Sequence, residues 1–482
     1  MVDLRPAGYV IGLLIASLGV TMLVPLGFDL WAGNGHWPVF FESSVLTVLC
    51  GGLVAIACAN GVTAGLNLRQ TFLLTIFVWF SLPIFGAIPF VLGATNATFT
   101  NAFFEAMSGL TTTGATVFSG LEALPEGLKV WRAILQWLGG VGIIVVAMVF
   151  LPELRVGGMQ IFRSEAFDTM GKILPRAGQI ARDISVIYVA LTLACALAYY
   201  STGMAPFDAF CHAMTTVSTG GMANSDASFG AYNPASHYVA VVFMFLAALP
   251  FVRFVQLLAG EARPLFQDSQ IKAFFLTYAI CVLLVASWLW GRDGFVTEQA
   301  FRESLFNVLS IMSGTGYASA DYMVWGTFPV VVFFFIGLIG GCAGSTSCSV
   351  KVFRYQLLFA SIKSQIRQIH SPHGIFPPRY EGRKVSDDVL NSVMAFFVAF
   401  LILLGLTTVL LGMTGLDFIT SVSGAAAAIG NIGPGLGPEI GPAGNYAGLN
   451  DLAKWILAAA MFIGRLEIMV VLAILAPKFW KS

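Results

Sequence analysis

Ten long apolar segments constrain this chain more than any other feature of its sequence. They cover approximately residues 9–30, 38–59, 70–92, 130–151, 184–203, 237–258, 271–290, 327–350, 388–412 and 453–476. About 20 apolar residues in a helix are long enough to cross the hydrocarbon core of a bilayer. Lipid offers no partner to backbone polar groups, so helices are the expected spanning elements. The sequence therefore predicts an all-α, polytopic membrane protein in contact with the lipid bilayer.

Composition and charge agree with this class. Of the 482 residues, 57% are hydrophobic and 10% are charged, whereas a soluble domain carries about 25% charged residues. The net charge is zero, so no nucleic-acid partner is expected. The scattered cysteines give neither a disulfide framework nor a zinc-binding spacing, and we interpret them as small packing residues. They are Cys50, Cys58, Cys195, Cys211, Cys281, Cys342 and Cys348.

The distribution of Lys and Arg predicts the orientation of the chain. With the N-terminus inside, nineteen of the 25 basic residues fall on the cytosolic side and five fall on the outer side, while Arg465 alone lies within a span. Basic residues accumulate on the cytoplasmic side of membrane proteins, so we expect both termini in the cytosol. The basic segments 152–183 and 351–388 suit either lipid headgroups or a cytosolic protein partner.

Four short segments with a common pattern lie between the long apolar runs, all on the predicted outer side. They read NAFFEAMSGLTTTG, DAFCHAMTTVSTGG, ESLFNVLSIMSGTG and TSVSGAAAAIGNIG, the last being the loosest match, and they end at Gly114, Gly221, Gly316 and Gly433. Each begins with a polar residue that is expected to cap a helix: Asn101, Asp208, Glu303 and Thr420. The apolar pieces 101–112, 208–218, 302–313 and 418–429 are too short to span a bilayer and suit re-entrant half-helices.

Each half-helix is followed by a Gly-containing stretch and flanked by two long spans. Four such units use eight of the ten spans, and the first two spans stand outside the repeat. Non-helical backbone at membrane depth is tolerated where protein buries it or water reaches it. Four such stretches around one axis could direct carbonyls at an ion in place of its hydration shell. The alternative for any single copy is an ordinary helix contact through small residues.

Several motifs resemble those of a known family. The stretches FFEAMSGLTTTGAT, QWLGGVGIIV, VGGMQIFRSE, GGCAGST, NIGPGLG and AKWIL…GRLE resemble the Trk/Ktr/HKT superfamily of potassium transporters, in particular its bacterial TrkH/TrkG type. The resemblance implies four M1–P–M2 repeats in one chain around a central pore, preceded by two extra transmembrane helices. It also implies potassium uptake across the bacterial inner membrane, a homodimer, and a cytosolic RCK partner that alone binds nucleotide. Potassium would be the transported ion, with no covalently bound cofactor.

The repeats divide the chain into five regions. Residues 1–68 hold the two N-terminal helices, 69–152 the first repeat, 153–258 a cytosolic loop and the second repeat, 259–350 the third repeat with a gating loop, and 351–482 a cytosolic segment and the fourth repeat.

The resemblance also implies a potassium-binding filter built mainly from backbone carbonyls. Its residues would be Thr112, Thr113 and Gly114, then Thr219, Gly220 and Gly221, then Gly314, Thr315 and Gly316, and finally Asn431, Ile432 and Gly433. The string T-V-G-Y-G of potassium channels is absent. One filter glycine per repeat fits a less stringent filter, through which some sodium or rubidium would pass.

The span 327–350 contains the stretch GLIGGCAGSTSCS, whose glycines and hydroxyl residues should interrupt a helix. A Gly-rich, closely packed helix is the alternative. By resemblance this stretch is an intramembrane gating loop beneath the filter. Its residues would be Gly340, Gly341, Cys342, Ala343, Gly344, Ser345 and Thr346. The family usually continues with STGGG where this chain has STSCS, so the loop should be stiffer here.

Arg465 is a charge within an apolar span, where charges are costly and face a cavity or a partner. By resemblance it lies near the pore below the filter, where it would repel a resident cation and speed its exit. A structural ion pair with Glu467 is the alternative.

We find no nucleophile–base set, no Walker motif and no paired carboxylates in a span, so an enzyme is not expected. A coupled secondary transporter would need such carboxylates, and a non-transporting scaffold would leave the four repeated segments unexplained. The open alternatives are a sodium- or ammonium-conducting member of the same fold and a proton- or sodium-coupled potassium symporter.

Overall fold

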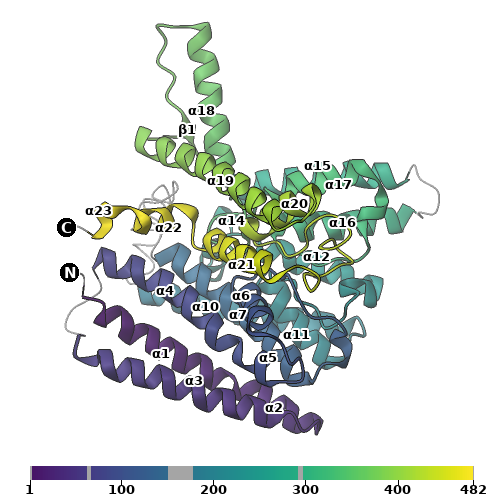
Figure 1. The fold of residues 1–482 in the computed structure, drawn as a ribbon. Coiled ribbons are helices and arrows are strands. Elements are labelled where there is room, and N and C mark those ends of the chain that lie inside the picture. The colour runs from purple at the N-terminus through teal and green to yellow at the C-terminus, as the bar shows by residue number, and fades with distance from the viewer. Residues whose placement is uncertain (1–2, 62–66, 150–176, 291–296, 481–482) are drawn as a thin grey trace.

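The computed structural model describes residues 3–61, 67–149, 177–290 and 297–480, and these are mainly helical (Figure 1). On length and composition, six helices within these residues could cross a membrane, or eight if each of two bent helix pairs counts as one span. The N-terminal spans are α1 (Arg5–Thr21) with α2 (Leu23–Ala32), and α3 (Trp37–Cys58). The expectation of a mainly helical chain, with apolar helices long enough to span a membrane, is therefore confirmed.

The remaining elements follow in the order of the predicted units. They are α4 (Leu68–Gly86), α5 (Ile88–Leu92), α6 (Phe99–Leu110) and α7 (Glu126–Val149); α10 (Ala177–Ser201), α11 (Pro206–Val217), α12 (Pro234–Ala247) and α13 (Phe251–Leu258); α14 (Arg263–Gln267), α15 (Ser269–Trp290), α16 (Thr297–Ser313) and α17 (Thr327–Gly337); and α18 (Val352–His370), α19 (Asp387–Met413), α20 (Phe418–Gly430), α21 (Asp451–Arg465), α22 (Ile468–Leu475) and α23 (Pro477–Trp480). The antiparallel strands β1 (Arg379–Tyr380) and β2 (Arg383–Lys384) lie between α18 and α19, and α18 projects from the body of the molecule (Figure 1).

Two segments that we expected to be continuous spans are sharply bent. In 237–258, α12 and α13 meet at 89°, and in 453–476, α21 and α22 meet at 104°. The first break falls at Pro250, because proline lacks an amide proton and moves the preceding residue out of the helical region. The second falls at Glu467, which has a φ of 67°. The expected interruption of 327–350 is present, since α17 ends at Gly337.

The four predicted half-helices exist as α6, α11, α16 and α20, but they begin earlier than expected, except for α20. The residues that we expected to cap them lie within the helices: Asn101, Asp208, Glu303 and Thr420. Thr98 caps α6 and Asp417 caps α20 through side-chain oxygens, while α11 starts with a proline after Ala205. The cap assignment was therefore wrong, because the first polar residue of each segment belongs to the helix itself.

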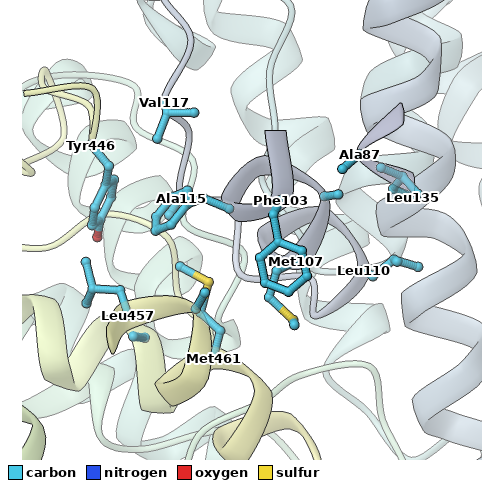
Figure 2. Packing of buried hydrophobic residues seen from close by; sticks show 14 of the residues in the cluster. Ala87, Phe103, Met107, Leu110, Ala115, Val117, Leu135, Tyr446, Leu457 and Met461 are labelled. Atoms are coloured by element: carbon cyan, nitrogen blue, oxygen red, sulfur yellow. The ribbon is translucent and has the colours of Figure 1, made fainter. Parts of the chain in front are cut away.

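Buried apolar packing fixes the first half-helix in place. Figure 2 shows Phe103 and Met107 of α6 facing Leu457 and Met461 of α21, with Leu135 of α7 on the other side. Helices within a membrane associate through this kind of close packing, because lipid tails are as apolar as the side chains. The contacts join the first predicted repeat to the fourth, although about 350 residues separate them in the sequence.

Candidate functional site: a ring of four glycines

Each half-helix ends in a similar turn, in which the first or second residue after the helix lies in the left-handed region. These residues are Thr112, Thr219, Gly314 and Asn431, with φ of 53°, 51°, 80° and 50°. Backbone amides just after this residue donate hydrogen bonds to carbonyls five or six residues earlier in the helix. One example is the bond from the Thr113 amide to the Ser108 carbonyl at 2.8 Å. Such a turn terminates many helices, normally with glycine. A β-branched threonine there is strained, so the surrounding structure must hold Thr112 and Thr219 in place.

Two residues further on, Gly114, Gly221, Gly316 and Gly433 all have φ between 77° and 93°. Each of these glycines lies against a backbone carbonyl of the next segment, so close that a Cβ atom would collide with it. The four contacts run from Gly114 to Gly220, from Gly221 to Thr315, from Gly316 to Ile432 and from Gly433 to Thr113, at 2.1, 1.8, 1.9 and 2.8 Å between the added Cβ and the carbonyl oxygen. The fourth contact returns to the first segment, so the four segments form a closed ring. We call it the glycine ring.

The glycine ring borders one cavity of about 180 Å³. All four glycines line it, together with the residues that follow them in the sequence, such as Ala115, Met222 and Pro434. A water molecule needs about 10–15 Å³ of such volume, so several waters or a hydrated ion fit. The cavity therefore lies beside the segments that follow the four glycines.

Side chains behind the ring hold its backbone in position. Gln136 of α7 donates from Nε2 to the Gly220 carbonyl at 2.6 Å and accepts from the Met222 amide at 3.0 Å. The Tyr446 hydroxyl donates to the Gly433 carbonyl at 2.7 Å. A carbonyl oxygen has two lone pairs, so each of these carbonyls keeps one lone pair for another partner.

A buried ion pair, which sequence reasoning missed, supports the segments after the first two glycines. Glu105 and Arg132 are 2.8 Å apart and 0% and 2% exposed. Glu105 also accepts from the Val117 amide at 2.9 Å, and Arg132 donates to the Ala223 carbonyl at 2.7 Å. From the sequence, Arg132 is only one of the five basic residues predicted on the outer side. The sequence feature that could have indicated this pair is the carboxylate of Glu105 within an otherwise apolar half-helix.

The predicted gating loop is non-helical and buried, which excludes the alternative of a closely packed helix. Its backbone is bonded to the α12–α13 bend: the Cys342 amide donates to the Ala248 carbonyl at 3.0 Å, and the Phe251 amide donates to the Gly344 carbonyl at 2.9 Å. The Thr346 hydroxyl donates to the Ala247 carbonyl at 3.0 Å. The bend that we did not expect is therefore the support on which this loop rests.

The same loop reaches the inner end of the glycine ring. The Ser349 amide donates to the Gly430 carbonyl at 3.1 Å, at the end of α20. The Cys348 sulfur lies 3.9 Å from the Thr112 hydroxyl, at the end of α6. The loop thus lies beside two of the four turns that begin the ring segments.

Arg465 ends α21 and is 3% exposed. It donates from Nη2 to the Gly139 carbonyl at 2.9 Å and from Nη1 to the Cys348 sulfur, and Nη1 lies 3.5 Å from the Thr346 carbonyl. Glu467 instead pairs with Arg354 at 2.6 Å. The alternative pairing of Arg465 with Glu467 is therefore wrong, because Arg465 is bound to the loop.

Comparison with known proteins assigns the chain to a family. The family model described as TrkH, cation transport protein, matches residues 36–482. The chain belongs to the TrkH family. It is 42% identical over 476 residues to the Trk system potassium uptake protein TrkI of Halomonas elongata, covering 98% of this chain and 96% of TrkI. It is 33% identical to TrkH of Escherichia coli, with 98% of each chain covered.

A solved TrkH structure has the same fold. The crystal structure of the potassium transporter TrkH from Vibrio parahaemolyticus superposes with a TM-score of 0.89 at 32% identity, covering 100% of both chains. These TrkH-family relatives are transporters, in agreement with the expectation that the chain is not an enzyme. Together with the apolar helices, family membership makes the chain a multi-pass membrane protein.

Most of the basic segment 152–183 lies outside the described residues. Within the described residues, no group of three or more His, Cys, Asp or Glu side chains could hold a metal ion.

Proposed function

We propose that this TrkH-family chain takes up potassium across the bacterial cytoplasmic membrane, along a channel-like path whose selective part is the glycine ring. The closed sequence of contacts from Gly114 through Gly221, Gly316 and Gly433 back to Thr113 carries this proposal. Such a closed arrangement surrounds a single axis, and a single axis is what an ion path requires.

Backbone carbonyls of the ring segments would replace the water around the ion. The filter residues Thr112–Gly114, Thr219–Gly221, Gly314–Gly316 and Asn431–Gly433 supply them. The half-helices α6, α11, α16 and α20 end immediately before these segments. The C-terminal end of a helix carries a partial negative charge, so four such ends favour a cation over an anion.

The helices group into four M1–P–M2 units around this axis. We assign α4, α6 and α7 to the first unit, α10, α11 and α12 to the second, α15, α16 and α17 to the third, and α19, α20 and α21 to the fourth. The α1–α3 helices precede them as two extra transmembrane spans. In each unit the half-helix ends at the glycine ring, which supports the grouping.

The loop Gly340–Thr346, with the residues up to Ser349, would act as the gate. It lies against the inner end of the ring through Cys348 and Ser349, and Arg465 donates to it. In this arrangement the loop restricts flow and the Arg465 charge shortens the stay of a cation below the ring.

Control of the gate would come from the cytosol. Helix α18 begins at Val352, three residues after Ser349, and projects from the body (Figure 1), with Lys363 and Arg367 exposed on it. We assign this side to a cytosolic RCK-type partner that binds nucleotide, and we place both termini there. A homodimer completes the assembly expected from family resemblance.

An isotope flux assay with purified protein in proteoliposomes tests the proposal. Entry of potassium, sodium and ammonium is compared, and potassium entry is measured with and without a sodium gradient or a proton gradient. We expect potassium to enter fastest and without a requirement for a sodium or proton gradient. If sodium or ammonium entered faster than potassium, that ion would be the substrate instead. If potassium entry strictly required a sodium or proton gradient, the chain would be a symporter and not a channel-like path.

A further inference from the structure

Cys348 lies under the centre of the glycine ring. Its sulfur is 3.9 Å from the Thr112 hydroxyl in the first ring segment. A Cβ added to Gly314, in the third segment, would lie 3.5 Å from the Cys348 nitrogen and 3.9 Å from its Cβ. The ring contacts place the first and third segments opposite each other, with the second and fourth between them. A residue that contacts two opposite segments of a four-part ring must lie close to its axis.

The same side chain also borders space on the inner side of the loop. A cavity of about 40 Å³ is lined by Cys348 and Arg465, together with Lys351, Glu467 and Ile143. This volume holds at least one water molecule. The Cys348 residue is 8% exposed, so the side chain is not sealed within the protein.

Arg465 holds the sulfur at this position and marks the cavity as polar. Its Nη1 donates to the Cys348 sulfur, and its Nε has no hydrogen-bond partner among the described residues although it is fully buried. A buried N–H without a partner is costly and favours a polar guest. The cavity beside Cys348 can therefore accept a small polar molecule in addition to water.

The other six cysteines lie away from this position. The structure describes all seven as free thiols. Cys342, in the same loop, is 0% exposed and its amide is bonded to Ala248. Cys195 and Cys211 are also fully buried, within α10 and α11. Cys348 is thus the cysteine whose side chain contacts the ring above and the cavity below.

We propose that Cys348 is a modification site on the ion path, at which a small thiol-reactive sulfur compound stops ion passage. This inference rests on the proposed function, because it assumes that ions leave the ring past Cys348. With a methanethiosulfonate, the cysteine sulfur attacks the sulfenyl sulfur and forms a new S–S bond. The bond from that sulfur to the sulfonyl group breaks, sulfinate leaves, and the thiol proton passes to water.

The size of the attached group explains the expected block. A methylthio group adds two heavy atoms in the narrow space between Thr112, Gly314 and Arg465, and extra atoms in a packed site force their neighbours apart or fill the remaining opening. We expect potassium flux to fall at least about tenfold, which corresponds to about 1.4 kcal/mol on the barrier to passage.

The experiment compares two single-cysteine chains in proteoliposomes. One keeps Cys348 and the other keeps Cys342, with the remaining cysteines replaced by serine; the full chain and its Cys348→Ser variant are measured in parallel. Each is treated with methyl methanethiosulfonate, and its potassium flux is compared with that of the same untreated sample. Mass spectrometry counts the attached groups, and dithiothreitol removes them.

We expect loss of flux and recovery with dithiothreitol in the full chain and in the chain that keeps Cys348, and no effect in the Cys348→Ser variant or in the chain that keeps Cys342. If Cys348 is labelled but flux is unchanged, or if it is never labelled while the full chain conducts potassium, the inference is wrong and the proposed function stands. If the untreated full chain carries no potassium-selective flux, the proposed function itself fails. Should the single-cysteine chains not assemble, the comparison of the full chain with Cys348→Ser decides the matter alone.

Discussion

Adding one methyl group to the glycine ring gives a graded test of its role. In Gly221→Ala the new Cβ would lie 1.8 Å from the Thr315 oxygen, although Cβ atoms essentially never come closer than 3.0 Å to a neighbour. The carbonyl would have to move by about 1.2 Å, the difference between the two distances. In Gly433→Ala the distance to the Thr113 oxygen is 2.8 Å, so a shift of about 0.2 Å is enough.

Both substitutions strain the backbone, but they differ in how far they displace the neighbouring carbonyl. Both place alanine in the left-handed region, which costs about 1–2 kcal/mol. Gly221→Ala adds an overpacking term of about 1–3 kcal/mol, and the group displaced is a carbonyl proposed to contact the ion. We expect its preference for potassium over sodium to fall by about tenfold or more, equivalent to about 1.4 kcal/mol. Gly433→Ala should change this preference much less.

Two control positions separate the effect of backbone strain from the effect of displacing a carbonyl. Gly382 has a φ of 79° and Gly415 a φ of 94°, close to the values of Gly221 and Gly433, but neither has an atom within 4 Å of an added Cβ. Alanine at these controls should lower thermal stability and leave selectivity unchanged. Potassium and sodium uptake are measured side by side in a strain that lacks its own potassium uptake. Equal selectivity in Gly221→Ala and Gly382→Ala, with both chains present in the membrane, would refute the reasoning.

Three further predictions concern the loop, its arginine and an outer contact. Deleting residues 343–346 removes two of the three hydrogen bonds that hold the loop to the α12–α13 bend, those of Gly344 and Thr346, so potassium flux in proteoliposomes should rise about tenfold or more; an unchanged flux would exclude a gating role. Arg465→Ala removes charged hydrogen bonds to the loop worth about 1.5–3 kcal/mol each. We expect the release of the loop to outweigh the slower exit of a cation in the absence of the charge, so resting potassium flux should rise while the protein still elutes as one assembled species; loss of expression alone would favour a structural role. A hydrogen bond from the Ser225 hydroxyl lowers the pKa of Glu122 below its usual 4.5, so Glu122 stabilises the fold above pH 4.5 and ceases to do so as pH falls through its lowered pKa. The difference in thermal unfolding temperature between Glu122→Gln and the unchanged chain should shrink over that range, and a constant difference would contradict the assignment.

Local patterns were sufficient for the half-helices and for the interrupted span. An apolar piece of about 12 residues cannot cross a bilayer, and Gly114 and its counterparts marked where each piece ends. The proline at the α12–α13 bend is visible in the sequence, but the apolar residues on both sides of it favour one continuous span. These features depend on residues that are neighbours in the chain.

The features that were missed depend on distant partners. Glu467 takes a left-handed conformation at the α21–α22 bend and pairs with Arg354, 113 residues away. Glu105 and Arg132 stabilise each other inside the protein, whereas each alone looks like a polar residue near a span end. The order of contacts around the glycine ring is likewise a property of the assembled fold. No local pattern specifies which carbonyl lies against Gly221.

The ring belongs to a single polypeptide, and its four corners are chemically different. They read Thr-Thr-Gly, Thr-Gly-Gly, Gly-Thr-Gly and Asn-Ile-Gly, and only the last has a side-chain amide, which donates to the Thr113 hydroxyl at 2.9 Å. In a pore assembled from four identical subunits, every substitution is present four times. Here a mutation alters one corner and leaves three intact, so the ion preference that we propose for the ring could be adjusted one corner at a time.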